Sequence, residues 1–416
     1  MKFNTVIIGG GLSGLVCGIR LQKAGIKTAI ISTGQSAMHF SSGSFDLLGK
    51  LPTGEAVTEP LEAIKKLGAE HPYSKVGAEK VAEYAAATKD FFASCSIKLN
   101  GDAKKNGYRI TPTGDYLPTW LSFEEFPVLE SKDEKLGEKA LIINLFGYLD
   151  FNTKFIASSL EKNGTKCRVA NIKYQAAEAM RENPTEARST NIAKTLVYPS
   201  NWETFKEGVK KQYKGEDLVI IPAVFGLKNA GLIEEIRAEF KDAKVLCFPT
   251  MPPSVPGIRT QATLKEEYLK LGGEFLLGDT VCAGDIKDSK VVSLSTVNFE
   301  EIKVMTDNVV LASGSFFSKG LIADPYKVYE PVFGLDVDFS ENRGEWYNLN
   351  FFKKQNYVNF GVKTNEKFQT SIQGKTIENL YAIGSVLSGA NTLYEGCGSG
   401  VAIMTAMKVA DEIISK

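Results

Sequence analysis

The feature that most constrains this chain is a glycine-rich loop between a short apolar strand and a helix at its N-terminus. The strand covers residues 5–8, and Lys27–Ser32 supplies a second strand after the helix. The loop is a G-x-G-x-x-G run made of Gly9, Gly10, Gly11, Leu12, Ser13 and Gly14. In such βαβ units the first glycine allows a tight turn, the second lets a pyrophosphate approach the backbone, and the third lets helix and strand pack closely. The pattern predicts a nucleotide-binding Rossmann-like unit; the alternative is a glycine-rich turn without a ligand.

One position of this fingerprint is unusual. Dinucleotide sites carry Asp or Glu at the end of the second strand, where the carboxylate bonds the adenosine ribose. Here Ser32 stands at that position, followed by Thr33 and Gly34. A hydroxyl bonds a ribose more weakly than a carboxylate does. No Arg or Lys follows directly to hold a 2′-phosphate, so NADP is not favoured, and the adenosine half of the site stays open.

Composition narrows the class of protein. A chain of 416 residues with 49 basic and 49 acidic side chains suggests two or three domains and gives no electrostatic reason to expect a nucleic-acid partner. The longest apolar stretch, residues 218–227, is too short to span a bilayer, and no signal peptide is expected before the first strand. None of the six cysteines forms a C-x-x-C pair, so no metal or iron–sulfur site is expected.

The order of expected elements predicts an α/β fold with a discontinuous Rossmann-like domain. Residues 1–50 and 250–416 form this nucleotide-binding domain in the prediction, because residues 308–314 and 379–384 look like further strands of its sheet. A helical and irregular cap segment is expected at 51–138. Alternating strands and helices at 139–249 predict an inserted α/β domain with its own parallel sheet. A helix is expected at 260–271.

Two late segments extend the match. Both resemble segments of the flavoproteins of the fumarate reductase and succinate dehydrogenase type. Residues 309–315 (VVLASGS) are similar to a strand of that family that ends in A-T-G-G. Residues 379–385 (NLYAIGS), followed by 395–400 (EGCGSG), are similar to its late strand and glycine-rich helix start. The resemblance implies that a helix dipole faces the flavin ring and stabilises the charge that builds up on reduction. The cofactor contacts it implies in these segments are Ser313, Gly314, Gly384, Ser385, Gly396 and Gly398.

A closer resemblance spans nearly the whole chain. The segments 35–44 (QSAMHFSSGS), 252–259 (PPSVPGIR), 343–347 (RGEWY) and 376–387 (TIENLYAIGSVL) are similar to those of the second flavoprotein subunit of bacterial anaerobic glycerol-3-phosphate dehydrogenases. The resemblance implies FMN as cofactor, with FAD as the alternative. Two partners are also implied, a catalytic flavoprotein (the A subunit) and an iron–sulfur, membrane-anchoring protein (the C subunit). The complex would lie at the cytoplasmic face of the inner membrane, held there through its partner subunits, and would pass electrons from sn-glycerol 3-phosphate to menaquinone.

Oxidation of a secondary alcohol needs a base and a hydride acceptor, and a phosphate group needs cations. We expect His39 as a candidate base, with packing against the cofactor as the alternative. Arg259 and Arg343 are the candidate cations, with a structural salt bridge or a contact with the cofactor phosphate as the alternative for each. The run Ser41, Ser42, Gly43 and Ser44 is expected to bind flavin or phosphate. A flavin-bearing relay or structural subunit without a substrate site of its own is the alternative function.

Overall fold

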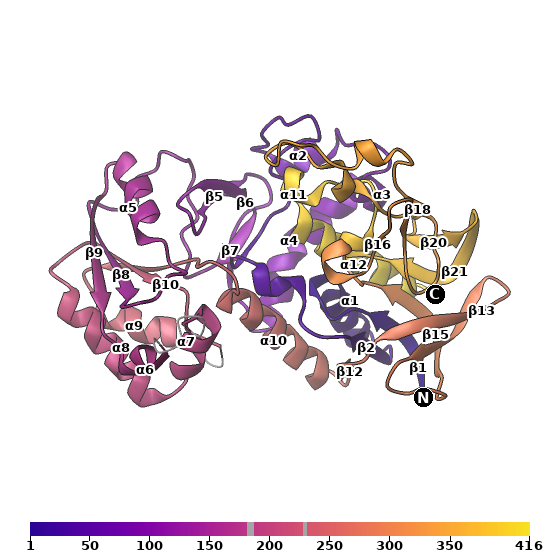
Figure 1. The fold of residues 1–416 in the computed structure, drawn as a ribbon, viewed down its shortest axis with the longest axis horizontal. Helices are drawn as coiled ribbons and strands as arrows, with labels where there is room; N and C mark the ends of the chain where they lie inside the picture. Colours follow the sequence, from indigo (N-terminus) through magenta and orange to yellow (C-terminus); the bar gives the residue numbers. More distant parts are fainter. Residues whose placement is uncertain (181–186, 228–230) are drawn as a thin grey trace.

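The computed structural model describes residues 1–180, 187–227 and 231–416. Its strands form two main sheets that lie side by side in Figure 1, with both chain termini beside the larger one. The larger sheet takes its strands from residues 2–32 and 274–382, and the smaller one takes all of its strands from residues 139–248. The chain therefore leaves the larger sheet after its second strand and returns to it more than 200 residues later. The exact domain limits drawn from the sequence stay a prediction.

The larger sheet has the strand order β12-β2-β1-β15-β14-β13, with β21 also paired to β15 and β20 to β21. Pairing is parallel between β12, β2, β1, β15 and β21, and antiparallel at β13–β14, β14–β15 and β20–β21. The central strands are nearly continuous apolar runs because both faces of the sheet are covered there. The strands are β1 (Lys2–Ile8), β2 (Thr28–Ser32), β12 (Glu274–Leu277), β13 (Val281–Lys287), β14 (Lys290–Thr296), β15 (Val304–Leu311), β20 (Gln369–Ile372) and β21 (Lys375–Ala382).

Three helices pack together beside this sheet. Helix α1 (Leu12–Lys23) contacts both α10 (Val255–Lys270) and α12 (Gly398–Ile414). Helix α10 begins five residues before the expected start at 260, because the Ser254 hydroxyl accepts a hydrogen bond from the Gly257 amide and caps its N-terminus. Proline suits a first helical turn, where its missing N–H would have no partner, so Pro256 does not delay the helix.

The segment 51–138 is helical first and then made of short strands, as the sequence predicts. Helices α3 and α4 contact α12, and strand β7 joins this segment to residues 44–45 through an antiparallel pair. Strand β3 (Ser44–Phe45) is the one outside the segment that pairs with it. The elements of the segment itself are α2 (Pro60–Ile64), α3 (Pro72–Val76), α4 (Ala78–Ser94), β4 (Leu99–Gly101), β5 (Gly107–Ile110), β6 (Tyr116–Thr119) and β7 (Leu121–Phe123).

The smaller sheet is parallel throughout, in the order β11-β10-β8-β9. Its strands are mostly buried, and the helices of the same stretch cover it (Figure 1). Its elements are β8 (Lys139–Leu145), α5 (Thr153–Lys162), β9 (Lys166–Ile172), α6 (Gln175–Ala179), α7 (Ser189–Thr195), α8 (Pro199–Gln212), β10 (Leu218–Pro222), α9 (Leu232–Glu239) and β11 (Lys244–Phe248).

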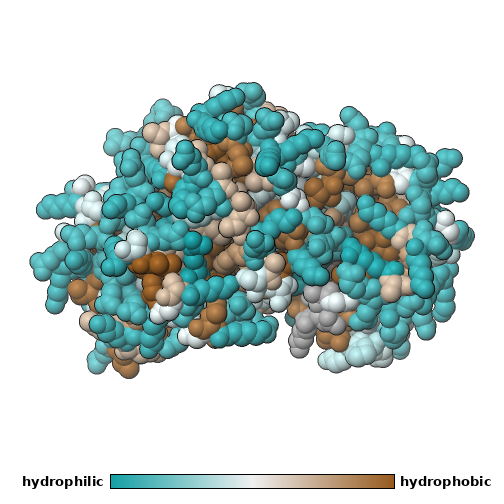
Figure 2. All heavy atoms as spheres, turned by 180° about the vertical axis from the view of Figure 1, so that it is seen from behind, coloured by the Kyte–Doolittle hydropathy of each residue, from teal (hydrophilic) through white to brown (hydrophobic). Residues whose placement is uncertain are grey.

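Short elements complete the chain. They are η1 (Ala37–Phe40), η4 (Phe316–Ser318), β16 (Ile322–Ala323), β17 (Val328–Tyr329), β18 (Val337–Asp338), η5 (Arg343–Glu345), η6 (Asn356–Asn359), β19 (Gly361–Val362), η7 (Gly384–Val386) and α11 (Thr392–Glu395). Within the described ranges, no helix has both the length and the apolar character needed to cross a membrane. The rear face is largely hydrophilic, and hydrophobic residues gather in its middle, between the two halves of the molecule (Figure 2).

Candidate functional site

The glycine loop has the geometry that its spacing predicts. Gly9 has φ +117°, and a Cβ there would lie 2.2 Å from the carbonyl oxygen of Ala312 on the neighbouring strand. A Cβ at Gly14 would lie 2.0 Å from the carbonyl oxygen of Gly9. Both positions therefore need glycine. A side chain at Gly9 would separate the ends of the two neighbouring strands, and one at Gly14 would separate the end of the first strand from helix α1.

Gly11 differs from these two glycines, because the space beside it is open. The nearest atom to a Cβ at this position would be the Ser36 Cβ at 3.7 Å. Gly11 is also the N-cap of α1, and no side chain caps the amides of that helix's first turn. Uncapped amides at the positive end of a helix dipole bind anions. The open face of the loop can thus take a phosphate group.

The two late segments predicted to join the loop do lie against it. A Cβ at Gly9 would lie 3.2 Å from the Ser313 amide, and one at Gly384 would lie 2.6 Å from the Ser13 hydroxyl. A Cβ at Gly314 would lie 3.7 Å from the Ser385 hydroxyl. The strand ends of β15 and β21 thus meet the start of α1 at one edge of the sheet. Here the buried Ser313 hydroxyl has no hydrogen-bond partner in the described part of the protein, so it is free to bond a ligand.

Ser32 lies at the end of β2, as expected, and its side chain faces the loop. A Cβ at Gly10 would lie 2.9 Å from the Ser32 hydroxyl, which donates to the carbonyl oxygen of Gly34 at 3.2 Å. Gly34 itself has nothing within 4 Å of a built Cβ. The second strand therefore ends in a hydroxyl beside open space, where an adenosine ribose would lie in a dinucleotide site.

His39 is connected to the glycine loop through Gln261, a residue that the sequence analysis did not single out. The His39 Nε2 lies 3.0 Å from the Gln261 Oε1, and the Gln261 Nε2 donates to the carbonyl oxygen of Gly10 at 2.9 Å. Burial lowers the pKa of His39, and the bond to Gln261 opposes this shift. The ring is therefore neutral at pH 7 and donates from Nε2, which suits a positioning role for His39.

A cavity of about 510 Å³ lies where the half with the larger sheet meets the cap segment and the chain that returns from the smaller sheet. The expected run contributes Ser41, Ser42 and Ser44, and the hydroxyls of Ser42 and Ser44 lie 2.9 Å apart. Gly43 keeps this run turned with φ +84°. The other lining residues are Phe40, Asp46, Arg109, Thr111, Pro112, Thr113, Thr250, Met251, Pro252 and Ser399.

Two charged residues of this cavity escaped the sequence analysis. Arg109 Nη2 lies 3.3 Å from the Asp46 Oδ2, while the Arg109 Nε and Asp46 Oδ1 are buried without a partner among the described residues. Asp46 is fixed by the start of α12, because its amide donates to the Ser399 hydroxyl and its carbonyl oxygen accepts from the Gly400 amide. Unpaired buried polar atoms are costly, so a polar ligand that bonds them would be stabilised. Gly398, the first residue of α12, thus stands beside this cavity.

The two expected cations lie elsewhere. Arg259 is only 9% exposed, forms an ion pair with Glu125 and stacks on Phe123. Arg343 lies in the short helix η5, with its guanidinium over the Trp346 ring. Neither side chain lines the cavity. Arg259 matches the structural salt bridge considered as its alternative, whereas Arg343 packs on the Trp346 ring instead. Their catalytic role stays a prediction without support from this geometry.

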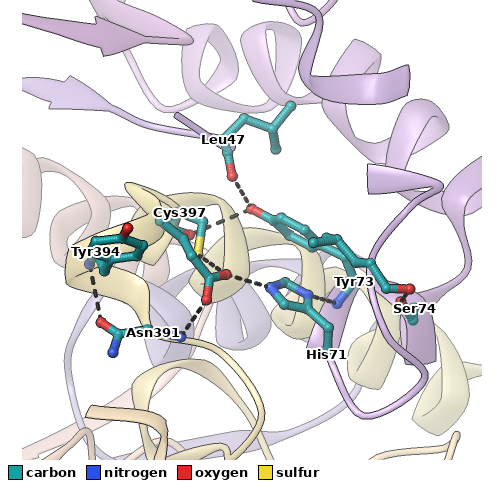
Figure 3. A network of polar contacts seen from close by, with 9 residues as sticks. Leu47, His71, Tyr73, Ser74, Asn391, Tyr394 and Cys397 are labelled. Atoms are coloured by element: carbon teal, nitrogen blue, oxygen red, sulfur yellow. Dashed lines mark hydrogen bonds and ion pairs between the residues drawn. The ribbon is translucent and has the colours of Figure 1, made fainter. Parts of the chain in front are cut away.

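Behind the start of α12 lies a buried polar network (Figure 3). The Glu395 carboxylate lies 3.1 Å from the His71 Nε2 and accepts the Asn391 amide at 2.9 Å, while the His71 Nδ1 accepts the Tyr73 amide. The Cys397 thiol lies 4.0 Å from the same carboxylate, and burial raises its pKa. Because His71 accepts at Nδ1, its Nε2 carries the proton and has no lone pair for a metal. Gly396, with φ +60°, completes the turn.

These residues fit a flavin nucleotide. The open Gly11, the uncapped α1 and the unpaired Ser313 hydroxyl form a phosphate-binding edge, and the cavity lies at the start of α12. Thr405 of α12 accepts the Gly384 amide beside the glycine loop. Since a helix rises about 1.5 Å per residue, Ser399 lies roughly 9 Å along α12 from this point. The glycine loop and the cavity are therefore connected through the first two turns of α12.

Comparison with known proteins agrees with this geometry. The family described as FAD binding domain matches residues 4–401. Relatives from Yersinia enterocolitica and Pectobacterium atrosepticum, named as the B subunit of anaerobic glycerol-3-phosphate dehydrogenase, are 39% and 38% identical, each match covering 100% of this chain and 99% of the relative. The relative of the same name from Glaesserella parasuis is 37% identical, with both chains covered completely. The chain therefore belongs to the FAD-binding-domain flavoproteins and, among them, to the family of anaerobic glycerol-3-phosphate dehydrogenase B subunits.

Proposed function

We propose that this chain is the flavin-bearing B subunit of an anaerobic respiratory glycerol-3-phosphate dehydrogenase and carries a substrate site of its own. The observation that supports this most is the polar cavity at the start of α12, with the Asp46–Arg109 pair, next to an open nucleotide edge. A flavin supplies a hydride acceptor for the oxidation of an alcohol. The residues of the chain then have to hold the substrate and remove its hydroxyl proton.

We propose FAD as the cofactor, in place of the FMN expected from the sequence. The matching family is described as an FAD binding domain, and this description does not support FMN as the first choice. Ser32 and the open space at Gly34 leave room for the adenosine half. Heat or acid extraction of the purified chain, followed by mass identification, should give FAD at about one per chain. Release of FMN from protein that has not been exposed to a pyrophosphatase would contradict this.

The Asp46–Arg109 pair is suited to a small polyol phosphate. The Arg109 guanidinium can donate to a phosphate oxygen, and the hydroxyls of Thr111 and Thr113 lie in the same lining. The Asp46 carboxylate can accept a hydroxyl proton, which is the role of a general base. In this assignment sn-glycerol 3-phosphate is oxidised to dihydroxyacetone phosphate. His39 acts on the glycine loop through Gln261 and does not contact the substrate.

We expect Arg109→Gln to raise the KM for sn-glycerol 3-phosphate about tenfold, since a bond to a charged group contributes roughly 1.5–3 kcal/mol. Asp46→Asn should lower kcat by a similar factor or more, with flavin content unchanged. Steady-state dye reduction by the purified chain measures both, because no other subunit's substrate site then contributes. Lys98→Gln, an exposed change on the cap segment, is the matched control. Unchanged KM and kcat in both cavity variants would favour a relay subunit without a substrate site.

We propose two partners at the cytoplasmic face of the membrane, a catalytic flavoprotein (the A subunit) and an iron–sulfur protein (the C subunit), because the relatives' name denotes one component of a larger enzyme. Menaquinone is the proposed final acceptor. We expect the isolated chain to reduce soluble dyes at best, and quinone reduction to appear when the iron–sulfur protein is added. Substrate-dependent menaquinone reduction by the chain alone would contradict this arrangement.

A further inference from the structure

A loop on the flavin-binding half holds three apolar side chains almost entirely in water. Leu349 is 94% exposed, Phe351 is 83% exposed and Phe352 is 92% exposed. The two phenylalanine rings contact each other edge to face, with centroids 5.7 Å apart. Single exposed apolar residues are common on protein surfaces, but several together on one loop mark an interaction site.

The loop is held in shape by its own polar side chains. Gln355 lies at its centre: its Oε1 accepts the Asn348 amide at 2.9 Å, and its Nε2 donates to the carbonyl oxygens of Asn350 and Lys353, each at 3.1 Å. The Asn350 side chain accepts the Phe352 amide at 3.0 Å. We call residues 347–355 the Gln355 loop. Its backbone is closed without help from the three apolar side chains, so their exposure is not a result of an unformed loop.

The base of the loop is joined to the buried part of the molecule. The carbonyl oxygen of Gln355 accepts the Asn391 Nδ2 at 2.8 Å, and the Tyr357 amide donates to the carbonyl oxygen of Trp346 at 2.7 Å. Trp346 is 3% exposed. The loop is therefore a fixed projection, and binding through it would not have to order a flexible segment first.

The charged residues nearest to the apolar tip in the sequence are positive. Lys353 and Lys354 follow Phe352 directly, and the sequence from Trp346 to Asn365 contains no acidic residue. Glu345 lies in the same surface hollow as both lysines, but its carboxylate accepts hydrogen bonds from Ser340 and Asn342. Phenylalanine and leucine side chains that enter the headgroup region, with lysines placed to meet lipid phosphates, are typical of interfacial membrane contacts.

We propose that the Gln355 loop binds directly to an anionic lipid surface, with Leu349, Phe351 and Phe352 inserted between the headgroups and Lys353 and Lys354 on their phosphates. The two lysines next to the apolar side chains favour this ligand over a protein partner, since lysines meet anionic headgroups, whereas stable protein interfaces need about 800 Å² on each side. The contact would orient the chain at the membrane independently of any anchoring partner protein, and it requires neither flavin nor substrate.

The test is co-sedimentation of the purified chain with vesicles of equal parts phosphatidylcholine and phosphatidylglycerol. The apolar variant Leu349→Ser/Phe351→Ser/Phe352→Ser should lower the partition coefficient at least tenfold. Lys353→Gln/Lys354→Gln should lower it about fivefold per charge, with little change on pure phosphatidylcholine, because each basic residue near such a surface adds roughly one kcal/mol. The matched control Leu277→Ser/Val297→Ser/Ile302→Ser removes three side chains that are 57–59% exposed elsewhere on the chain and should bind as wild type.

A second measurement does not depend on the partition coefficient. In Phe352→Trp, tryptophan emission should shift to the blue when anionic vesicles are added. The proposal is overturned if the wild-type chain binds these vesicles no better than the apolar variant does. It is also overturned if the apolar variant changes the mass of the chain in solution while vesicle binding is absent, since the loop would then contact a second copy. Flavin absorbance, followed throughout, reports on the proposed function separately.

Discussion

Gly14→Val is expected to give a chain that carries no flavin and unfolds more easily. A Cβ at this position would lie 2.0 Å from the carbonyl oxygen of Gly9 and 3.3 Å from the Ile7 side chain, so α1 has to move away from β1. Overpacking a well-packed core typically lowers the free energy of unfolding by up to ~3 kcal/mol. The displaced helix also withdraws its N-terminal amides from the phosphate edge. Flavin absorbance per chain and the midpoint of urea unfolding measure the two effects.

Two other glycine substitutions separate folding from binding. Gly11→Asp places its side chain in open space, so the chain should fold as the flavin-free wild type does, while the new carboxylate repels a phosphate at the helix N-terminus. Gly68→Val is the control, because Gly68 is exposed and has nothing within 4 Å of a built Cβ. Flavin stoichiometry that stays at the wild-type value in soluble Gly11→Asp and Gly14→Val protein would rule out the proposed phosphate site.

Glu395→Ala should lower the free energy of unfolding by about 3 kcal/mol, because each buried donor left without an acceptor costs roughly 1–3 kcal/mol. Glu395 is 1% exposed and His71 is 3% exposed, so truncation leaves the His71 Nε2–H and the Asn391 amide without acceptors in a dry site. Glu395→Gln keeps an oxygen acceptor and should cost less than half as much. Denaturant unfolding of the flavin-free chain measures both losses.

Glu395→Ala also tests whether the buried network of His71 and Glu395 stabilises the turn before α12. The carbonyl oxygen of Glu395 accepts the amides of Gly49 and Lys50, so the network also holds the stretch of chain that carries Asp46. Glu366→Ala removes an exposed carboxylate and serves as the control. If Glu395→Ala unfolds at the wild-type denaturant concentration, the buried pair contributes nothing to stability and this account of the network is wrong.

Local patterns in the sequence are sufficient to predict the nucleotide edge. The spacing of Gly9, Gly11 and Gly14 specifies a turn, an open approach and a close helix contact, and the structure adds the neighbouring strand that a Cβ at Gly9 would meet, at Ala312. The runs expected at 308–314 and 379–384 are confirmed as strands, which end at Leu311 in β15 and at Ala382 in β21 and pair there in parallel. These predictions succeed because strand runs and glycine turns are determined by neighbours in sequence.

The chemistry of the cavity depends on contacts that sequence spacing does not contain. Asp46 and Arg109 are 63 residues apart, and Arg109 lies in a segment whose prolines predict only irregular or β structure. Asp46 follows the expected Ser-Gly run after one intervening residue, Phe45, so a carboxylate close to the end of that run was the available signal. The arginines that were expected to bind substrate lie near motifs of the resemblance, but Arg259 meets Glu125, a partner 134 residues away.

The sequence by itself determined the fold class, the nucleotide loop and the family, because these depend on short periodic patterns and on motifs read in order. Only the tertiary structure decided which polar side chains meet. His71 and Glu395 are separated by 324 residues, and Gln261 reaches Gly10 across 251 residues. Such pairs depend on how helices and loops pack on the completed sheets, and a buried polar group is satisfied by whichever partner that packing brings within hydrogen-bond distance.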